Sequence, residues 1–182
     1  MSKEREEAAQ ERQTRLAARD QVMSEEEQSR WAHIMLKVDA DIQGGLGWSA
    51  VGVMATVEDP TLPFTYTIGF REHDLHPELI LVGMSPTQAH PLLGILYDRV
   101  SSGERFEDGQ TDSRVLEGYD VKFKALPPDG RPLNVARHFY GLDELPALQV
   151  VWPDTNGVFP DEDGFEERFV GWQDLDQIRE ED

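Results

Sequence analysis

Histidine and carboxylate side chains at short spacing are the residues of this sequence that can do chemistry. His76 and Glu78 lie two positions apart in a polar segment, where an imidazole and a carboxylate can act as a general acid–base pair. The alternative for His76 is a turn histidine whose ring hydrogen-bonds the backbone. His90 is a third candidate for catalysis, although a surface position on a predicted helix is the simpler interpretation.

The pair His73 and His76, beside Glu78, has a spacing that can also present metal ligands. A metal site needs three or four ligands that converge in space, and so short a motif is common by chance. The chain has no cysteine, which excludes thiolate metal sites, iron–sulfur clusters and a disulfide framework. We therefore predict no metal and no cofactor.

An arginine near aromatic side chains is the second chemical feature. Arg137 and Tyr140 precede the last predicted strand, which ends at Trp152, and a guanidinium in such a place can bind a carboxylate or a phosphate. The alternative is a structural ion pair between Arg137 and a nearby acid. The sequence contains no Gly-x-Ser-x-Gly elbow and no glycine-rich phosphate loop, so an enzyme is the less favoured interpretation.

The charge of the chain is strongly negative, with 36 acidic and 17 basic residues and a formal net charge of −19. Phosphate groups are bound by Lys and Arg, which argues against direct binding to nucleic acid or to an anionic membrane. No apolar run approaches the roughly 20 residues that a membrane span needs, and no secretory signal follows Met1, so we expect a cytoplasmic protein. Residues 143–182 hold 13 acids and two bases, which favours a basic protein partner.

The elements that position these residues predict an α+β fold. Ser24 with Glu27, and Ser85 with Gln88, form capping boxes that begin two amphipathic helices. Alternating or apolar runs predict about five strands in a mainly antiparallel sheet, with two or three helices packed on one face. The predicted strands are Trp48–Val57, Phe64–Phe70, Glu78–Met84, Tyr119–Ala125 and Leu148–Trp152, and a short third helix is predicted over Leu133–Tyr140.

Two parts of different character make up the chain. Residues 1–23 are rich in Glu, Gln, Arg and Ala with few apolar residues, which indicates a charged helical or mobile extension. Pairing of two such helices would form a homodimer. Residues 24–182 are predicted to be a single α+β domain with an acidic C-terminal arm after the last strand.

Several motifs in order resemble those of a known family. Phe64-Thr-Tyr-Thr-Ile-Gly-Phe70 is followed by His76-Pro-Glu-Leu-Ile80, then by Ser102-Gly-Glu-Arg-Phe106 and Pro146-Ala-Leu-Gln-Val-Val-Trp-Pro-Asp154. From about residue 47 to residue 169 the sequence is similar to the DUF4262 family of bacteria and their phages. The resemblance implies a compact cytoplasmic domain and supplies no reaction. It implies site candidates at the polar matching positions, among Tyr66, Gly69, His76, Pro77, Glu78, His90, Arg105, Gln149, Trp152 and Asp154.

Two hypotheses about function follow. The favoured one is an interaction or regulatory protein that engages a basic protein partner. The alternative is a small enzyme or ligand-binding domain with a pocket around His76, Glu78, Arg137 and Trp152, in which Tyr66 and Gln149 are further ligand-binding candidates. That alternative requires these side chains to converge in one concave pocket.

Overall fold

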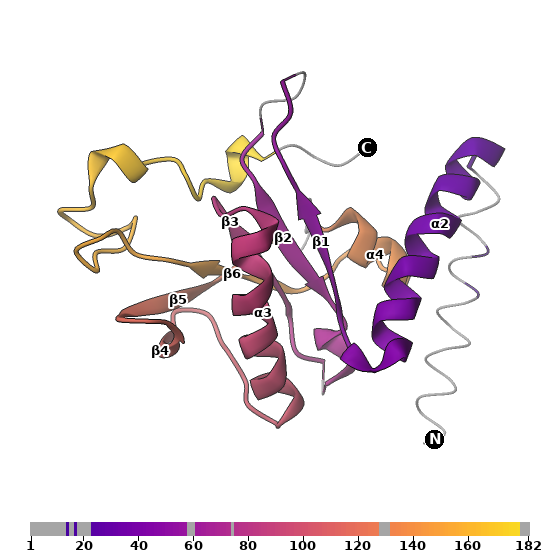
Figure 1. Cartoon of the computed structure of the whole chain (residues 1–182), viewed down its shortest axis with the longest axis horizontal. Coiled ribbons are helices and arrows are strands. Elements are labelled where there is room, and N and C mark those ends of the chain that lie inside the picture. Colours follow the sequence, from indigo (N-terminus) through magenta and orange to yellow (C-terminus); the bar gives the residue numbers. More distant parts are fainter. Residues whose placement is uncertain are drawn as a thin grey trace.

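The computed structural model describes residues 23–57, 61–73, 75–127 and 132–178, together with Thr14 and Ala17. From residue 23 onward, the described chain has three α-helices and six strands (Figure 1). The helices are α2 (Glu25–Asp41), α3 (Pro86–Ser101) and α4 (Asn134–Tyr140), and the strands are β1 (Ser49–Val53), β2 (Phe64–Ile68), β3 (Glu78–Val82), β4 (Thr111–Leu116), β5 (Tyr119–Ala125) and β6 (Ala147–Val151).

The strands form one sheet in the order β1-β2-β3-β6-β5-β4. Four of the five neighbouring pairs are antiparallel, and β3 with β6 is the parallel pair. The predicted α+β class with a mainly antiparallel sheet is confirmed, with six strands in place of about five. The additional strand, β4, is an edge strand of mostly polar residues, and the hydrophobic pattern therefore gave no signal for it.

Helices cover both faces of the sheet, and the prediction that they share one face is wrong. Residues of α3 pack with Leu79 and Leu81 of β3, whereas residues of α2 and α4 pack with Ile80 and Val82 of the same strand. Figure 1 shows α3 crossing the front of the sheet, with α4 behind it. A strand covered on both sides is apolar on both faces, and this is why β3, after Glu78 at its start, lacks the alternation of a half-exposed strand.

Gly69 changes the direction of the chain at the end of β2. The predicted strand continued to Phe70 with one uniform face, but Gly69 has a φ of 123° and the chain enters a short 3₁₀ turn, Phe70–Glu72. Tyr66 and Ile68 therefore pack under α4 and α2, while Phe70 packs on the α3 side. The turn brings the backbone N–H groups of Gly69 and Arg71 over the first residue of β3, where they meet the site described below.

Both predicted capping boxes are present and fix the starts of α2 and α3. At the first helix the Ser24 hydroxyl accepts the Glu27 backbone N–H, and the Glu27 carboxylate accepts the Ser24 backbone N–H; Ser85 and Gln88 form the same box at the second. In the described part of the chain, no helix is long and apolar enough to cross a membrane. The predicted helical or mobile extension over residues 1–23, and the homodimer proposed through it, lie outside the described residues except for Thr14, Ala17 and Met23.

The segment after β6, residues 153–178, is the C-terminal arm (yellow in Figure 1). It contains no strand or α-helix, only two 3₁₀ turns, Glu167–Phe169 and Leu175–Gln177. Asp154 organises its first loop, because the carboxylate accepts backbone N–H bonds from Asn156, Val158 and Glu166 at 2.8–3.0 Å. The arm is thus an irregular but ordered part of the fold.

Candidate functional site

Glu78 lies at the centre of a buried polar cluster at the start of β3. Its side chain is fully buried. Oε2 accepts a hydrogen bond from the Thr67 hydroxyl at 2.6 Å, and Oε1 accepts one from the Tyr140 hydroxyl at 2.5 Å. The backbone N–H groups of Gly69 and Arg71 also donate to Oε1, at 3.2 and 3.1 Å. Four donors from β2, α4 and the turn after β2 therefore converge on one carboxyl group.

The environment of Glu78 changes its acidity. Burial raises the pKa of Glu78, since a charged carboxylate loses its hydration, and the bonds from Thr67, Tyr140 and the two N–H groups oppose this shift. Burial, and next the proximity of Glu78, raise the pKa of Tyr140 well above its ordinary value. Tyr140 is therefore a neutral phenol, and its hydroxyl donates a hydrogen bond to Glu78 across the interface between α4 and the sheet.

Both ring nitrogens of His76 are bonded to the backbone. Nδ1 lies 2.6 Å from the Pro77 carbonyl oxygen and donates to it, and Nε2 accepts from the Phe106 N–H at 3.2 Å. The Phe70 and Phe106 rings flank the imidazole. Burial, together with the positive charge of Arg105 and the nearby His73, lowers the pKa of His76, and the ring is held as the neutral Nδ1–H tautomer.

The hydrogen bonds of His76 and Glu78 argue against the general acid–base pair that the sequence offers as a candidate. His76 and Glu78 each hold different backbone segments, and the bonds they make leave neither side chain facing open solvent. The geometry corresponds to the alternative interpretation of His76 as a turn histidine. His90, by contrast, is exposed on α3, where its ring lies 4.9 Å from that of Trp48.

Tyr66 and Arg137 are both connected with α4. The Tyr66 hydroxyl lies in the core and accepts the Val135 N–H at 3.1 Å, which satisfies one of the free donors in the first turn of that helix. Arg137 donates to the side chain of Asn134 one turn earlier and to the Asp143 carbonyl oxygen at 3.5 Å. Both residues thus fix the helix and the loop that follows it.

Gln149 and Trp152 of the β6 segment hold the C-terminal arm through a residue that sequence reasoning missed, Gln173. The Gln173 side chain accepts from the Trp152 N–H at 3.0 Å and donates to the Trp152 carbonyl at 2.8 Å, as a neighbouring strand would. Gln149 Nε2 donates to the Gln173 carbonyl at 2.7 Å. The Trp152 indole N–H bonds the Val82 carbonyl at the far end of β3 from Glu78.

The arm also touches β3 directly at Gly83. A Cβ added there would lie 2.3 Å from the Trp172 carbonyl oxygen, so this contact requires glycine. The structure therefore brings Gln149, Trp152 and the arm together, and separates them from Glu78 at the other end of β3 and from Arg137 on α4. None of the four residues His76, Glu78, Arg137 and Trp152 lines either of the two grooves described below.

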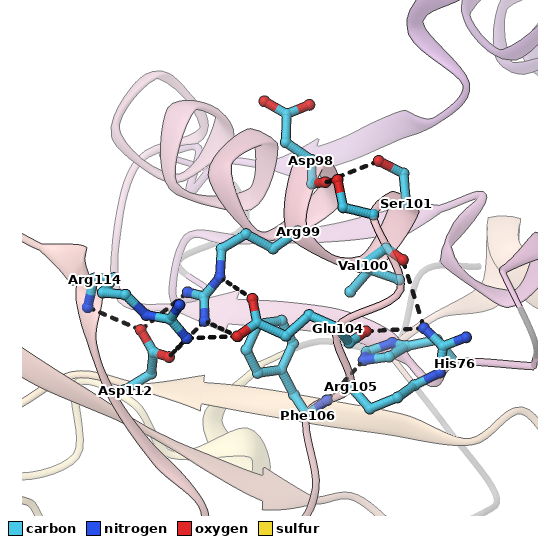
Figure 2. A network of polar contacts seen from close by, with 11 residues as sticks. His76, Asp98, Arg99, Val100, Ser101, Glu104, Arg105, Phe106, Asp112 and Arg114 are labelled. Carbon is cyan, nitrogen blue, oxygen red and sulfur yellow. Dashed lines mark hydrogen bonds and ion pairs between the residues drawn. The ribbon is translucent and has the colours of Figure 1, made fainter.

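A second polar network, which the sequence did not predict, joins α3 to β4 (Figure 2). Arg99 donates to both carboxylate oxygens of Glu104 and of Asp112, and Arg114 reaches the same two acids. The hydrogen bonds from these guanidinium groups lower the pKa of Glu104 to about 2 and hold that of Asp112 below its usual range. Each member is paired with another member inside the chain, which favours a structural role for the network.

A groove of about 870 Å³ lies between the arm and the outer strands. Lys122, Lys124, Gln149 and Val151 of β5 and β6 line one side of it, and Phe169, Val170, Gly171 and residues 173–177 of the arm line the other. We refer to it as the arm groove. The lining includes two lysines, Lys122 and Lys124. It also includes four aspartates, Asp108, Asp161, Asp174 and Asp176.

One of the two lysines is neutralised within the chain. Lys122 forms an ion pair with Asp161 at 3.0 Å, and its ammonium lies 4.9 Å from the centre of the Phe159 ring. Val170 of the groove lining is 64% exposed, and Trp172, which follows the lining residue Gly171 in the chain, is 47% exposed and meets the Phe169 ring edge to face. The arm groove therefore combines a net negative lining with exposed apolar surface. Among the described residues, no group of three or more His, Asp or Glu is placed to hold a metal ion.

The comparisons with known proteins give one positive result. No curated protein and no solved structure matches this chain. The model of a family described as a domain of unknown function, DUF4262, matches residues 44–166, close to the span of about 47–169 expected from the motifs. That match includes the Glu78 cluster, His76 and Trp152, and it covers more than half of the sequence, so the chain belongs to the DUF4262 family.

Proposed function

We propose that this protein is an interaction domain that binds a basic segment of a protein partner in the arm groove. The observation that carries the proposal is the lining of that groove, which holds four aspartates and two lysines; after the Lys122–Asp161 ion pair is set aside, three aspartates remain against Lys124 alone. A partner rich in Arg or Lys would gain complementary charge there, whereas phosphate or an anionic membrane would be repelled.

Exposed apolar side chains beside the groove support the same proposal. Binding energy at protein interfaces concentrates in a few aromatic anchors, and tryptophan is among the commonest of them. Trp172 is half-exposed although the arm around it is fixed by Gln173 and by the contact with Gly83. An anchor presented on a fixed segment loses little freedom when a partner binds, which favours affinity.

A defined peptide tests the proposal. We expect the full-length protein to bind a fluorescein-labelled peptide that alternates arginine with leucine, and fluorescence anisotropy measures the affinity. The double variant Asp174→Asn/Asp176→Asn should weaken binding roughly five- to tenfold, since each exposed ion pair contributes up to about 1 kcal/mol. Trp172→Ala should weaken it by about thirtyfold, the effect of losing an anchor of about 2 kcal/mol.

The matched control removes the same amount of charge elsewhere. Glu117→Gln/Asp120→Asn changes an exposed residue of the turn between β4 and β5 and an exposed residue at the start of β5, both outside the groove lining. It should change the affinity by less than about twofold at 0.15 M salt, where the Debye length is about 8 Å. Equal weakening by both double variants would mean that the peptide responds to net charge alone, and would refute a specific site. Absence of binding at low salt would refute the proposal altogether.

The enzyme alternative has no comparable support, because His76 and Glu78 make their bonds inside the chain. We keep a cytoplasmic location and the absence of a cofactor as predictions.

A further inference from the structure

A second groove lies at the opposite end of the sheet, along the edge strand β1. β1 is the first strand in the sheet order and pairs only with β2. In the described residues, no backbone hydrogen bond joins its outer edge to another segment. Such an edge presents a row of N–H and C=O groups that can pair with an added strand.

The groove has a volume of about 440 Å³ and two different walls. One wall is the edge of β1 from Ser49 to Gly52, and the other is formed by apolar side chains of α2 (Trp31, Ile34 and Val38) with Val135 of α4. Figure 1 shows that α2 and β1 meet at the turn that joins them and separate toward the start of the helix. We refer to this groove as the edge groove.

The charge of the edge groove is opposite to that of the chain. Arg30, His33 and Lys37, spaced along one side of α2, line it, and no aspartate or glutamate does. In a chain with 36 acidic residues, an acid-free lining with basic side chains selects for a negatively charged occupant. The apolar wall adds a requirement for apolar side chains on the same occupant.

We propose that the edge groove binds an acidic, apolar peptide segment of another protein as an added β-strand on β1. In this arrangement the peptide backbone pairs with the edge of β1, and alternate side chains point toward α2, where apolar groups meet Ile34 and Val38. Its carboxylates lie beside Arg30 and Lys37. This site is separate from the arm groove and would accept the opposite kind of partner.

A second copy of this chain is a less suitable occupant. Pairing of two β1 strands about a two-fold axis would bring the Arg30, His33 and Lys37 sides of two helices toward one another, and like charges that face each other oppose association. An anionic fatty acid would satisfy the apolar wall and the basic rim. It would leave the backbone edge of β1 unpaired, and this favours a peptide.

The test uses the full-length protein and a labelled peptide that alternates glutamate with valine. Two variants make the same chemical change in the two grooves: Lys37→Glu at the edge groove and Lys124→Glu at the arm groove. We expect Lys37→Glu to weaken binding of the acidic peptide about tenfold, and Lys124→Glu to leave it within about twofold. In ¹⁵N–¹H spectra, the amide signals of residues 49–53 should shift on binding.

A backbone-blocked peptide separates strand addition from simple charge attraction. The same peptide N-methylated at every residue keeps its charges and loses its hydrogen-bond donors, so its affinity should fall at least tenfold. Equal binding of both peptides, equal weakening by both lysine variants, or self-association of the protein with shifts at β1 would each overturn the proposal. Binding of oleate at residues 49–53 with no binding of the peptide would overturn it in favour of a lipid. None of these outcomes depends on whether the arm groove binds a basic partner.

Discussion

The centre of the sheet and the C-terminal arm both carry many polar groups, but they use them differently. At the centre, the Glu78 carboxyl group accepts four hydrogen bonds, and both nitrogens of His76 are bonded. Along the arm, Asp174 and Asp176 line an open groove beside the exposed Trp172. His76 and Glu78, the residues that the sequence marks most clearly for catalysis, thus support the fold. The surface that we propose for a partner lies on the C-terminal arm, which has no regular hydrophobic pattern.

Glu78→Ala should have the largest effect on stability. Because Glu78 lies outside the arm groove, this variant also separates stability of the fold from peptide binding most clearly. Removing the carboxyl group leaves the Thr67 and Tyr140 hydroxyls and the Arg71 N–H without their acceptor, while the Gly69 N–H keeps its bond to the Tyr140 hydroxyl; the loss should cost about 3–5 kcal/mol in the free energy of unfolding. Urea denaturation measures this cost. Glu78→Gln keeps an acceptor and should lose less than half as much. A stable Glu78→Ala protein with a specific loss of activity or binding would move the functional site to the centre of the sheet.

The arm should depend on Gln173 more than on its neighbour Gln177. Gln173→Ala removes both bonds to the Trp152 backbone and should cost about 2 kcal/mol, with hydrogen exchange accelerated over residues 169–177. Gln177→Ala, an exposed side chain with one 3.3 Å bond to Asp174, is the matched control and should cost less than about 0.5 kcal/mol. Similar losses for the two variants would mean that the arm is not held at Trp152.

His76 should make the fold sensitive to mild acid. Its pKa is lowered in the folded protein, so the unfolded chain takes up a proton near pH 6.5 that the folded chain resists. The free energy of unfolding should therefore fall as the pH drops below about 6.5, until the folded-state pKa is reached. An NMR titration of the His76 ring should give a value below 6.5 with the Nδ1–H tautomer. A value at or above 6.5 would show that the Phe106 bond does not fix the neutral ring.

Trp172→Ala should have only a small effect on stability, although we expect a large effect on peptide binding. The ring is half-exposed and packs edge to face on Phe169, so its loss should cost less than about 1 kcal/mol. Thermal unfolding measures this, together with the anisotropy assay. A large loss of stability with unchanged peptide affinity would identify Trp172 as a core residue and remove the anchor from the proposal.

Local patterns predicted most elements of this fold, because their causes are local. Capping at Ser24 and Ser85 and the apolar run of β3 are each visible within a few residues of sequence. The strand β4 was missed because its buried Asp112 is stabilised by Arg99, a partner from another element. Phe70 was assigned to the wrong face because the φ of Gly69, and not the alternation, decides its direction.

The candidate site was harder to predict than the fold, because its residues depend on partners that are distant in the sequence. The family motifs identified His76, Glu78, Gln149 and Trp152, and these residues do occupy special positions, but their partners Tyr140, Phe106 and Gln173 come from distant segments. The acidic composition of the last 40 residues favoured a basic partner at this segment, which stays a prediction. No sequence pattern could show that the arm turns back on β5 and β6 and encloses a groove.

Mapping of the arginine–leucine peptide by ¹⁵N–¹H NMR on the full-length protein tests the central claim most directly. Binding in the arm groove should shift the amide signals of residues 169–177 and of Lys122 and Lys124, and leave those of Glu78 and of β1 unchanged. Shifts centred on Glu78 and His76, or shifts spread evenly over all exposed acidic residues, would contradict the account.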